Sequence, residues 1–251
     1  MKYICSWSGG KDSTAQIILA HEHNEPLDLI VFSEVMFDKN ISGELPEHID
    51  FIKNKCIPLF KSWGYEVKIL HAKHTYMDIF MREPTRGKRY GTGLIAGFPM
   101  SGKCAINREC KVKPIKDYLK TMDGEFTQYI GIATDELKRM ERLKGNSMSL
   151  LEKYNQTEQM AYELCKKNDL LSPVYEFTKR GGCWFCPNAR CRELRHLRDN
   201  HRNLWDKLLE LEKVPNTIGY CWNVLTKTSI TELDKNFEWE SQQYTIFDYG
   251  I

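Results

Sequence analysis

The chain has 251 residues, of which 41% are hydrophobic and 28% are charged, and its formal net charge at pH 7 is +2. This length accommodates one α/β domain with a small additional module, and the nearly balanced charge means that any basic surface must be local. No apolar run approaches membrane-spanning length and no signal-like leader precedes the first strand, so we expect a cytoplasmic protein without membrane contact. Nine cysteines are many for such a chain, and clustered cysteines in the cytoplasm indicate metal binding or redox chemistry more often than disulfides.

The first motif joins a predicted strand, residues 3–7, to a predicted helix, residues 13–23. It reads Ser-Gly-Gly-Lys-Asp-Ser and spans residues 8–13. The adjacent glycines let the backbone turn so that successive N–H groups point at one spot, and the first helical turn adds unpaired N–H groups and a positive dipole end. With the hydroxyls of Ser8 and Ser13 and the ammonium of Lys11, this spot suits a phosphate or a sulfate. A plain strand-to-helix turn is the alternative interpretation.

The hexapeptide resembles the pyrophosphate loop of the adenine-nucleotide alpha-hydrolase superfamily. That superfamily includes ATP pyrophosphatases, tRNA thiolases and the phosphoadenosine-phosphosulfate (PAPS) reductase family. The resemblance implies a loop that binds ATP with Mg²⁺, formed by Ser8, Gly9, Gly10, Lys11, Asp12 and Ser13. Within it, Lys11 and Asp12 are the residues that we expect to take part in catalysis. The hexapeptide alone does not separate the branches of the superfamily.

Strand and helix patterns alternate after this motif. Residues 27–35 are rich in β-branched and apolar side chains, residues 46–63 have helical spacing, and residues 65–70 form another short strand pattern. This alternation predicts an α/β fold in which a Rossmann-like parallel sheet carries helices on both faces. Such sheets bind ligands at the carboxyl ends of their strands, where the 8–13 loop lies. We expect residues 1–175 to form a nucleotide-binding domain and residues 176–251 a cysteine-rich module with a helical and aromatic tail.

Residues 74–110 are difficult to assign to regular structure, because glycine and proline interrupt every helical pattern. Basic residues outnumber acidic ones in this segment: Arg82, Arg86, Lys88, Arg89, Lys103 and Arg108. A long irregular segment inside a compact domain is usually either functional or disordered. A solvated basic loop and a lid that faces the substrate both stay open as interpretations.

A helix start with the sequence Cys-Lys-Val-Lys-Pro occupies residues 110–114. It resembles the cysteine–lysine–proline helix start of the PAPS reductase family, which faces the nucleotide. Proline in a first helical turn costs little. Lys111 and Lys113 are then placed to meet phosphate or sulfate, so both are candidate catalytic residues.

A second signature overlaps the end of the predicted strand 126–133 and continues into the next helix. Its residues Gly131, Asp135, Glu136 and Arg139 resemble the strand end and the acidic–basic helix start that the family places near the nucleotide. An ordinary N-capped helix is the competing interpretation.

The late cysteines have the spacing of metal ligands. Cys183 and Cys186 form a C-x2-C turn, and Cys191 follows shortly after. A fourth thiolate can come from Cys110 or Cys104 if the fold brings the segments together. Four thiolates suit either a tetrahedral zinc ion or an iron–sulfur cluster.

An early cysteine combined with a late C-x2-C resembles the iron–sulfur members of the family, which are assimilatory sulfonucleotide reductases and DNA-phosphorothioation sulfurtransferases. Residues 180–187, Arg-Gly-Gly-Cys-Trp-Phe-Cys-Pro, are especially similar to the second group. The resemblance implies a 4Fe–4S cluster on Cys110, Cys183, Cys186 and Cys191, with Cys104 as the alternate ligand and Zn²⁺ as the alternative metal.

A strongly charged helix is predicted over residues 191–213, and Arg195, Arg198 and Arg202 share one of its faces. This arginine stripe either guides a phosphate backbone or is a solvated helix face. The tail beyond Pro215 is aromatic, and we expect it to pack on the main domain. Its aromatic residues are Tyr220, Trp222, Phe237, Trp239, Tyr244, Phe247 and Tyr249.

One departure from the family concerns the C-terminal segment. PAPS reductases carry a catalytic cysteine there in a Glu-Cys-Gly-Leu-His motif, which this sequence lacks. We therefore expect an ATP-dependent, adenylating and pyrophosphate-releasing sulfurtransferase. Its sulfur would come from a cysteine desulfurase or another donor, and its acceptor would be either a nucleic acid or a small molecule. A sulfonucleotide reductase and a non-catalytic module that binds a nucleotide and a metal are the alternatives.

Overall fold

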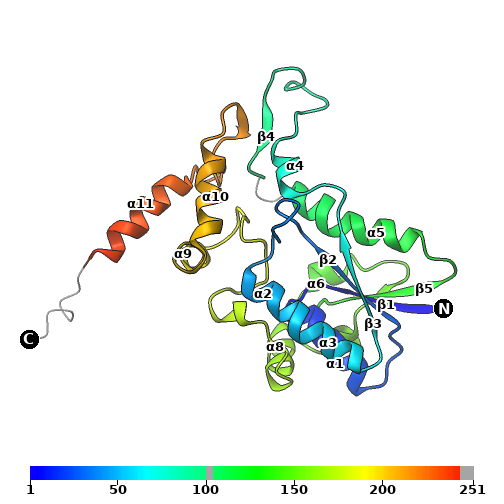
Figure 1. Ribbon diagram of the computed structural model, residues 1–251. Helices are drawn as coiled ribbons and strands as arrows, with labels where there is room; N and C mark the ends of the chain where they lie inside the picture. Colours follow the sequence, from blue (N-terminus) through cyan, green and yellow to red (C-terminus); the bar gives the residue numbers. More distant parts are fainter. Residues whose placement is uncertain (100–103, 244–251) are drawn as a thin grey trace, which may run out of the picture. The chain divides into compact units, whose positions relative to one another are not determined.

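The computed structural model describes residues 1–99 and 104–243 (Figure 1). The chain forms two compact units, and each of them is made of two chain segments. Unit 1 contains Met1–Lys73 and Asn107–Cys183, and unit 2 contains His74–Ile106 and Trp184–Ile251. This division differs from the predicted boundary at residue 175, because the irregular segment after residue 73 groups with the C-terminal part of the chain.

Unit 1 is built on a five-stranded sheet with the strand order β3-β2-β1-β5-β6. Every neighbouring pair of strands is parallel, and Ile4 at the centre pairs with Leu29 on one side and Gln128 on the other. The strands are β1 (Lys2–Trp7), β2 (Leu29–Glu34), β3 (Glu66–His71), β5 (Phe126–Ile130) and β6 (Ser147–Met148). The predicted Rossmann-like α/β fold with a parallel sheet is thereby confirmed.

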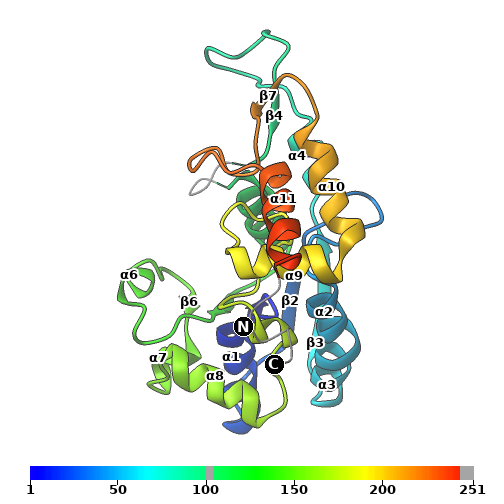
Figure 2. The same cartoon turned by 90° about the vertical axis from the view of Figure 1, so that its left-hand side faces the viewer.

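Helices cover both faces of this sheet, as Figure 1 shows. On one face lie α1 (Lys11–Glu22), α7 (Leu150–Lys153), α8 (Glu158–Lys167) and a continuous helical run of α2 (Pro46–Asp50), the π-helical η1 (Phe51–Cys56) and α3 (Ile57–Ser62). The other face carries α5 (Lys113–Lys120), which follows the π-helical η2 (Asn107–Val112) and buries Leu119 against the sheet. Figure 2 shows α8 alongside α1. Two short elements, α6 (Leu137–Met140) and the 3₁₀ helix η3 (Pro173–Glu176), complete the unit.

Aromatic packing fixes the first helix on the sheet. The Trp7 ring at the end of β1 lies 5.1 Å from the Phe60 ring, centroid to centroid. Its Nε1–H donates to the Thr14 hydroxyl over 2.9 Å. Trp7 and Thr14 are both almost fully buried, so this hydrogen bond satisfies polar atoms that would otherwise be costly to bury. The loop between β1 and α1 is therefore held at both of its ends.

Unit 2 contains α4 (Tyr76–Phe80), α9 (Cys191–Asn200), α10 (Arg202–Glu212) and α11 (Ile230–Ser241). Its short strands β4 (Ile95–Gly97) and β7 (Thr217–Gly219) pair in parallel. They approach so closely that a Cβ atom on Gly97 would lie 2.5 Å from the Gly219 carbonyl oxygen. This pair joins the irregular segment to the C-terminal part of the chain.

One sequence prediction about this unit needs correction. The single helix predicted over residues 191–213 is wrong, since the chain breaks at His201, where φ is −133° and ψ is 56°. The tail also forms helix α11, whose Phe237 ring packs 6.0 Å from the Trp205 ring of α10. Phe237 thus belongs to the core of unit 2. Tyr244, Phe247 and Tyr249 lie outside the described residues, as does Lys103.

The helices were also compared with the requirements of a membrane span. Among the described residues, no helix is both long enough and apolar enough to cross a bilayer.

Candidate functional site

The loop between β1 and α1 has a geometry that requires glycine. Gly9 has a φ of +74°, and a Cβ atom there would come within 2.6 Å of Ile52 Cδ1 and 2.7 Å of His48 Cε1. A side chain at this position would therefore be both strained and in collision with the helical run that begins at α2. Gly10 is the N-cap of α1, in extended conformation. The two predicted glycines thus make the sharp turn that aims the start of α1 at the carboxyl edge of the sheet.

Hydroxyl groups close this loop. The Ser13 hydroxyl donates to the Gly10 carbonyl oxygen over 3.1 Å and accepts from the Ser8 amide over 3.1 Å. The amide of Lys11 donates to the Tyr175 hydroxyl over 2.9 Å. Within the described part of the chain, the amides of Asp12 and Ser13 have no acceptor. Two first-turn donors at the positive end of the α1 dipole are therefore available to an anion.

Three carboxylates gather beside the same loop. Oxygen atoms of Asp12, Glu136 and Glu158 lie within 4.8 Å of one another. The Lys11 ammonium donates to Asp12 over 2.7 Å and to Glu158 over 3.0 Å. Burial raises the pKa of Asp12, and the negative charges of Glu158 and Glu136 add to that rise, which the contact with Lys11 only partly offsets. Lys11 and Arg139 thus bring two positive charges to three carboxylates, which leaves one negative charge in excess.

This donor set fits Mg²⁺. Magnesium prefers oxygen ligands and is usually held by one or two carboxylates together with the phosphates of a substrate. Asp12, Glu136 and Glu158 would hold the ion, and the ion would supply positive charge beside the available amides of α1.

The second signature is divided between two roles. Gly131 lies directly against α1, since a Cβ atom on it would be 2.7 Å from the Asp12 carbonyl carbon and 2.7 Å from the Ser13 nitrogen. Glu136 joins the carboxylate group and also accepts from Arg139 over 2.5 Å. Asp135 instead accepts from the amide of Glu158 over 3.0 Å, at the start of α8. Gly131, Glu136 and Arg139 are thus brought to the loop, whereas Asp135 positions a neighbouring helix.

The two candidate lysines of the third motif also differ. Lys111 forms an ion pair with the buried carboxylate of Glu44, with an N–O distance of 2.9 Å. Lys113 is exposed and pairs with Asp117 on its own helix. Of the two, Lys111 has the ordered position and the buried partner.

Glu44 also connects two of the predicted metal ligands. Its backbone forms an isolated antiparallel bridge with Cys183, while its carboxylate holds Lys111, the neighbour of Cys110. The Cys110 carbonyl accepts from the Ser33 hydroxyl at the end of β2 over 2.9 Å. Within unit 1, the chain segments that carry Cys110 and Cys183 therefore meet at Glu44.

The other candidate ligands belong to unit 2. Cys104 and Cys186 are half-buried there, and Cys191 is exposed at the first residue of α9. The 4Fe–4S cluster and its zinc alternative stay predictions. Other thiols are plainly core groups, because burial raises the pKa of Cys5 and of Cys165 to about 12 and so keeps both protonated.

His48 is a site residue that sequence reasoning missed. It is 1% exposed and lies behind the loop, with Nδ1 2.7 Å from the Ser172 hydroxyl and Nε2 3.3 Å from the Ser8 carbonyl oxygen. Burial lowers its pKa, although Glu44 and the Ser8 carbonyl oppose that shift, so the ring is neutral. Because a carbonyl can only accept, Nε2 carries the proton and Nδ1 accepts from Ser172. A single histidine in a helical pattern gives no sequence signal for this role, and neither does Tyr175.

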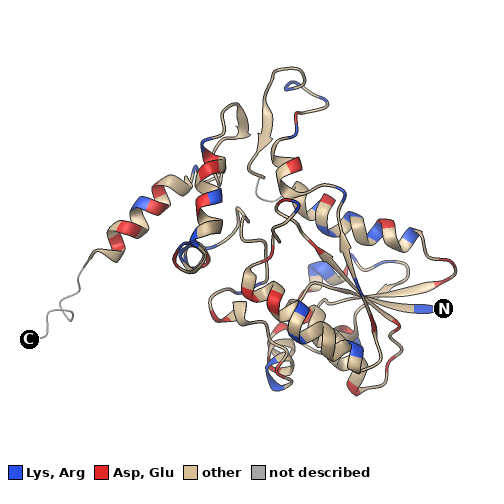
Figure 3. Ribbon diagram, viewed as in Figure 1, with Lys and Arg blue, Asp and Glu red and all other residues tan. Residues whose placement is uncertain are grey.

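The arginine stripe of unit 2 is covered by acidic residues of α11. Arg198 donates to Asp234 over 2.8 Å and to Glu238 over 2.5 Å. Arg202 reaches Asp234 over 3.2 Å, and Arg195 pairs with Glu240. Figure 3 shows the acidic residues along α11. The stripe is therefore engaged within the unit and is not a free surface for phosphate.

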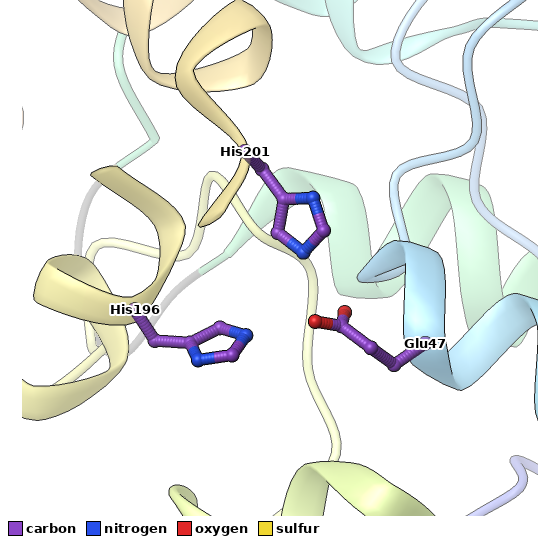
Figure 4. A group of neighbouring side chains, drawn as sticks. All are labelled: Glu47, His196 and His201. Atoms are coloured by element: carbon purple, nitrogen blue, oxygen red, sulfur yellow. The ribbon is translucent and has the colours of Figure 1, made fainter. Parts of the chain in front are cut away.

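Two histidines flank the break between α9 and α10. The rings of His196 and His201 lie 5.7 Å apart, centroid to centroid, and the Asn200 side chain donates to the His196 carbonyl oxygen over 3.1 Å. Figure 4 shows both rings. Within unit 2, two imidazole rings therefore lie near the point where the predicted single helix is interrupted.

Comparisons with known proteins leave the function to be argued from this geometry. No protein-family model matches the chain. Over 221 residues, it is 24% identical to an uncharacterized protein of Methanocaldococcus jannaschii, an alignment that covers 83% of this chain and 47% of that protein. The chain thus spans about half the length of the curated relative that it matches. Membership of the PAPS reductase family stays a prediction.

Proposed function

We propose that the chain binds ATP with Mg²⁺ at the loop of residues 8–13 and transfers the adenylyl group to an acceptor, releasing pyrophosphate. One observation carries the proposal: the available amides of Asp12 and Ser13 lie beside three crowded carboxylates at the carboxyl end of β1. Amides at a helix start suit phosphate, and crowded carboxylates suit the magnesium ion that accompanies it. The two features together favour a metal–nucleotide complex over a free anion.

The reaction requires positioning and charge stabilisation more than covalent chemistry from the protein. An acceptor oxygen attacks the α-phosphorus, the bond from this phosphorus to the bridging oxygen breaks, and pyrophosphate leaves with that oxygen. The α1 amides and Lys11 hold the β- and γ-phosphates, and Lys11 exchanges its bonds to Asp12 and Glu158 for phosphate oxygens. The charge that develops on the leaving pyrophosphate is met by these fixed donors.

Sulfur transfer is the second half of the proposal. A sulfur nucleophile at the sulfide level comes either from a cysteine desulfurase persulfide reduced by a second thiol, which is thereby oxidised to a disulfide, or from another reduced donor. The bond from the adenylated atom of the acceptor to this sulfur forms as its bond to the AMP oxygen breaks, and AMP leaves with that oxygen. Lys111 follows Cys110, whose carbonyl accepts from Ser33 of β2, and is held by Glu44. We assign Lys111 to the charge of the leaving phosphate. The predicted cluster on Cys110, Cys183, Cys186 and Cys191, with Cys104 as alternate, would hold or pass on sulfur.

The first experiment identifies the products. The full chain is incubated with Mg²⁺ and α-labelled ATP, with and without oligonucleotides as acceptors, and exchange of labelled pyrophosphate into ATP is followed in parallel. We expect AMP, adenylated product and pyrophosphate exchange. ADP and inorganic phosphate as the main products would contradict the proposal. Tight ATP binding without exchange under any condition would support the non-catalytic module, and thioredoxin-dependent sulfite release from PAPS would support the reductase.

The second experiment concerns the metal. Protein purified without oxygen is expected to be brown and to contain iron and acid-labile sulfide in equal amounts. Cys183→Ser should lose both, whereas Cys165→Ser, a change at a core thiol of α8, should keep both. One zinc per chain without iron would establish structural zinc and remove sulfur handling from the proposal.

A further inference from the structure

The loop between α4 and β4 carries charges that no other described residue neutralises. Its tip, residues 85–93, reads Thr-Arg-Gly-Lys-Arg-Tyr-Gly-Thr-Gly and is exposed throughout. It presents three cations, Arg86, Lys88 and Arg89, and within residues 1–99 and 104–243 none of the three forms an ion pair. Figure 3 shows basic residues at this tip. Next to the cations, the Tyr90 ring is 69% exposed.

The backbone of the tip is organised by its own turns. The Tyr90 amide donates to the Gly87 carbonyl oxygen over 3.1 Å, and the Thr92 hydroxyl donates to the Arg89 carbonyl oxygen over 2.8 Å. Glycines occupy left-handed positions on both sides of the aromatic ring, with φ of +82° at Gly87 and +70° at Gly91. At the base of the loop, the Ala96 amide donates to the Arg82 carbonyl oxygen over 2.8 Å. The turns use backbone groups, so the charged and aromatic side chains are left uncommitted.

The arginine stripe on α9 and α10 is the informative contrast. There, Arg198 faces Asp234 and Glu238 of α11, so its charge is already satisfied. An uncompensated cluster of like charges repels itself and gains most from a polyanion. The loop tip, and not the stripe, therefore has the electrostatic character that a phosphate backbone requires.

We propose that residues 85–93 are a docking surface for single-stranded nucleic acid, in which Arg86, Lys88 and Arg89 contact phosphates and Tyr90 stacks on a base. Cations interleaved with an exposed aromatic ring are the combination by which proteins bind single strands without strict sequence preference. An anionic membrane is the less suitable partner, because insertion needs further apolar side chains, and Tyr90 has only glycine, threonine and charged residues around it. This surface goes beyond the adenylyl-transfer proposal and does not depend on it.

The test is binding of fluorescently labelled oligothymidylate and oligouridylate to the full chain, followed by anisotropy at salt concentrations from about 50 to 200 mM. Three phosphate contacts on a single strand predict a slope of about −2 in a plot of log K against log salt. R86E/K88E/R89E should weaken binding at least about 30-fold at the lowest salt and bring the slope close to zero. Y90A should weaken binding about 10-fold with an unchanged slope, and Y90F should bind like the wild type.

Matched controls separate a docking surface from general electrostatics. K61E/K116E/K120E changes the net charge by the same amount on exposed lysines of unit 1 and should bind oligonucleotide within about 3-fold of the wild type. All variants should keep the circular dichroism spectrum and the ATP affinity of the wild type. Absent oligonucleotide binding in the wild type would overturn the proposal, as would equal losses in the two charge-reversal variants. Binding to phosphatidylserine vesicles but not to oligonucleotides would also overturn it. ATP binding is measured separately, so its failure leaves this result interpretable.

Discussion

At the start of α1, three carboxylates lie close to one another, and two of them share the ammonium of Lys11. In unit 2, the arginines of α9 and α10 instead form ion pairs with the carboxylates of α11. The consequences for pKa are opposite. Burial and like charges raise the pKa of Asp12. Burial also opposes ionisation of Asp234, but hydrogen bonds from Arg198 and Trp205 outweigh it and lower the pKa of that carboxyl.

The difference separates a binding site from a structural network. Opposite charges in contact stabilise the fold as it stands, whereas like charges in contact destabilise it until a ligand arrives. The first arrangement holds α11 on α9 and α10. In the second, Lys11 and Arg139 supply two positive charges against the three negative charges of Asp12, Glu136 and Glu158, so the site that we propose for Mg²⁺ has one carboxylate charge in excess.

We expect the largest effect from a substitution that disrupts the cluster of three carboxylates. Asp12→Asn removes one charge and one oxygen ligand, so AMP formation at fixed Mg²⁺ should fall about 100-fold or more. Glu163→Gln is the matched control, since Glu163 lies on α8 like Glu158 but accepts, within the described part of the chain, only from Gln159. Equal rates in the two variants would remove the carboxylate group from the mechanism.

We expect the next largest effect from a substitution in the ion pairs between α11 and the helices α9 and α10. Arg198→Ala leaves Asp234 and Glu238 without their principal donor and should lower the free energy of unfolding by about 2 kcal/mol. Arg202→Ala, a change at a more exposed side chain, should cost less than about 1 kcal/mol. Chemical denaturation followed by circular dichroism measures both. A cost for Arg198→Ala no larger than that for Arg202→Ala would show that the network does not hold α11.

We expect a smaller effect from a substitution that tests whether ATP binds at the first turn of α1. Gly131→Ala places a methyl group against the backbone of Asp12 and Ser13 and should weaken ATP binding about 10-fold by displacing the first turn of α1. Gly182→Ala provides the control, because a Cβ atom there meets nothing within 4 Å. Isothermal titration with Mg²⁺–ATP makes the comparison, and unchanged affinity in Gly131→Ala would place the nucleotide elsewhere.

The smallest effect is a pH dependence. The pKa of His48 is lowered from 6.5 in the folded chain, so the unfolded chain binds a proton that the folded chain does not. The contribution of His48 to the free energy of unfolding is complete above pH 6.5. As the pH falls below 6.5 toward the lowered pKa, this contribution decreases by about 1 kcal/mol per pH unit. His48→Asn should flatten this slope in urea unfolding as the pH falls below 6.5. His23→Asn, a change at an exposed histidine, should retain it.

Much of unit 1 could be predicted because its signals are local. The apolar run of β2, residues 29–34, is buried at every position, and such a run between helical patterns indicates a parallel strand. The adjacent glycines of the first loop likewise predict a sharp turn from the sequence alone. The fold class and the strand–turn–helix geometry of the loop therefore agree with the interpretation of the sequence, whereas its binding of ATP stays a prediction.

What could not be predicted depends on partners distant in the chain. Helical spacing puts Arg195, Arg198 and Arg202 on one face, but only the fold shows that α11 covers that face. His48 acquires its role from Ser172 and from the Ser8 carbonyl, and neither contact leaves a pattern near residue 48. Propensity also favours one long helix over residues 191–213, which the break at His201 interrupts.

The parallel pairing of β4 with β7 has a consequence for the order of folding. Residues 95–97 are synthesised early, but their partners, residues 217–219, come from near the end of the described chain. Contacts between such distant segments form slowly, because a long loop must close before they contribute. During synthesis, the first segment of unit 2 must therefore wait until most of unit 1 has left the ribosome. During this interval the edge of β4 is unpaired, so the nascent chain is most liable to misassemble or to bind chaperones.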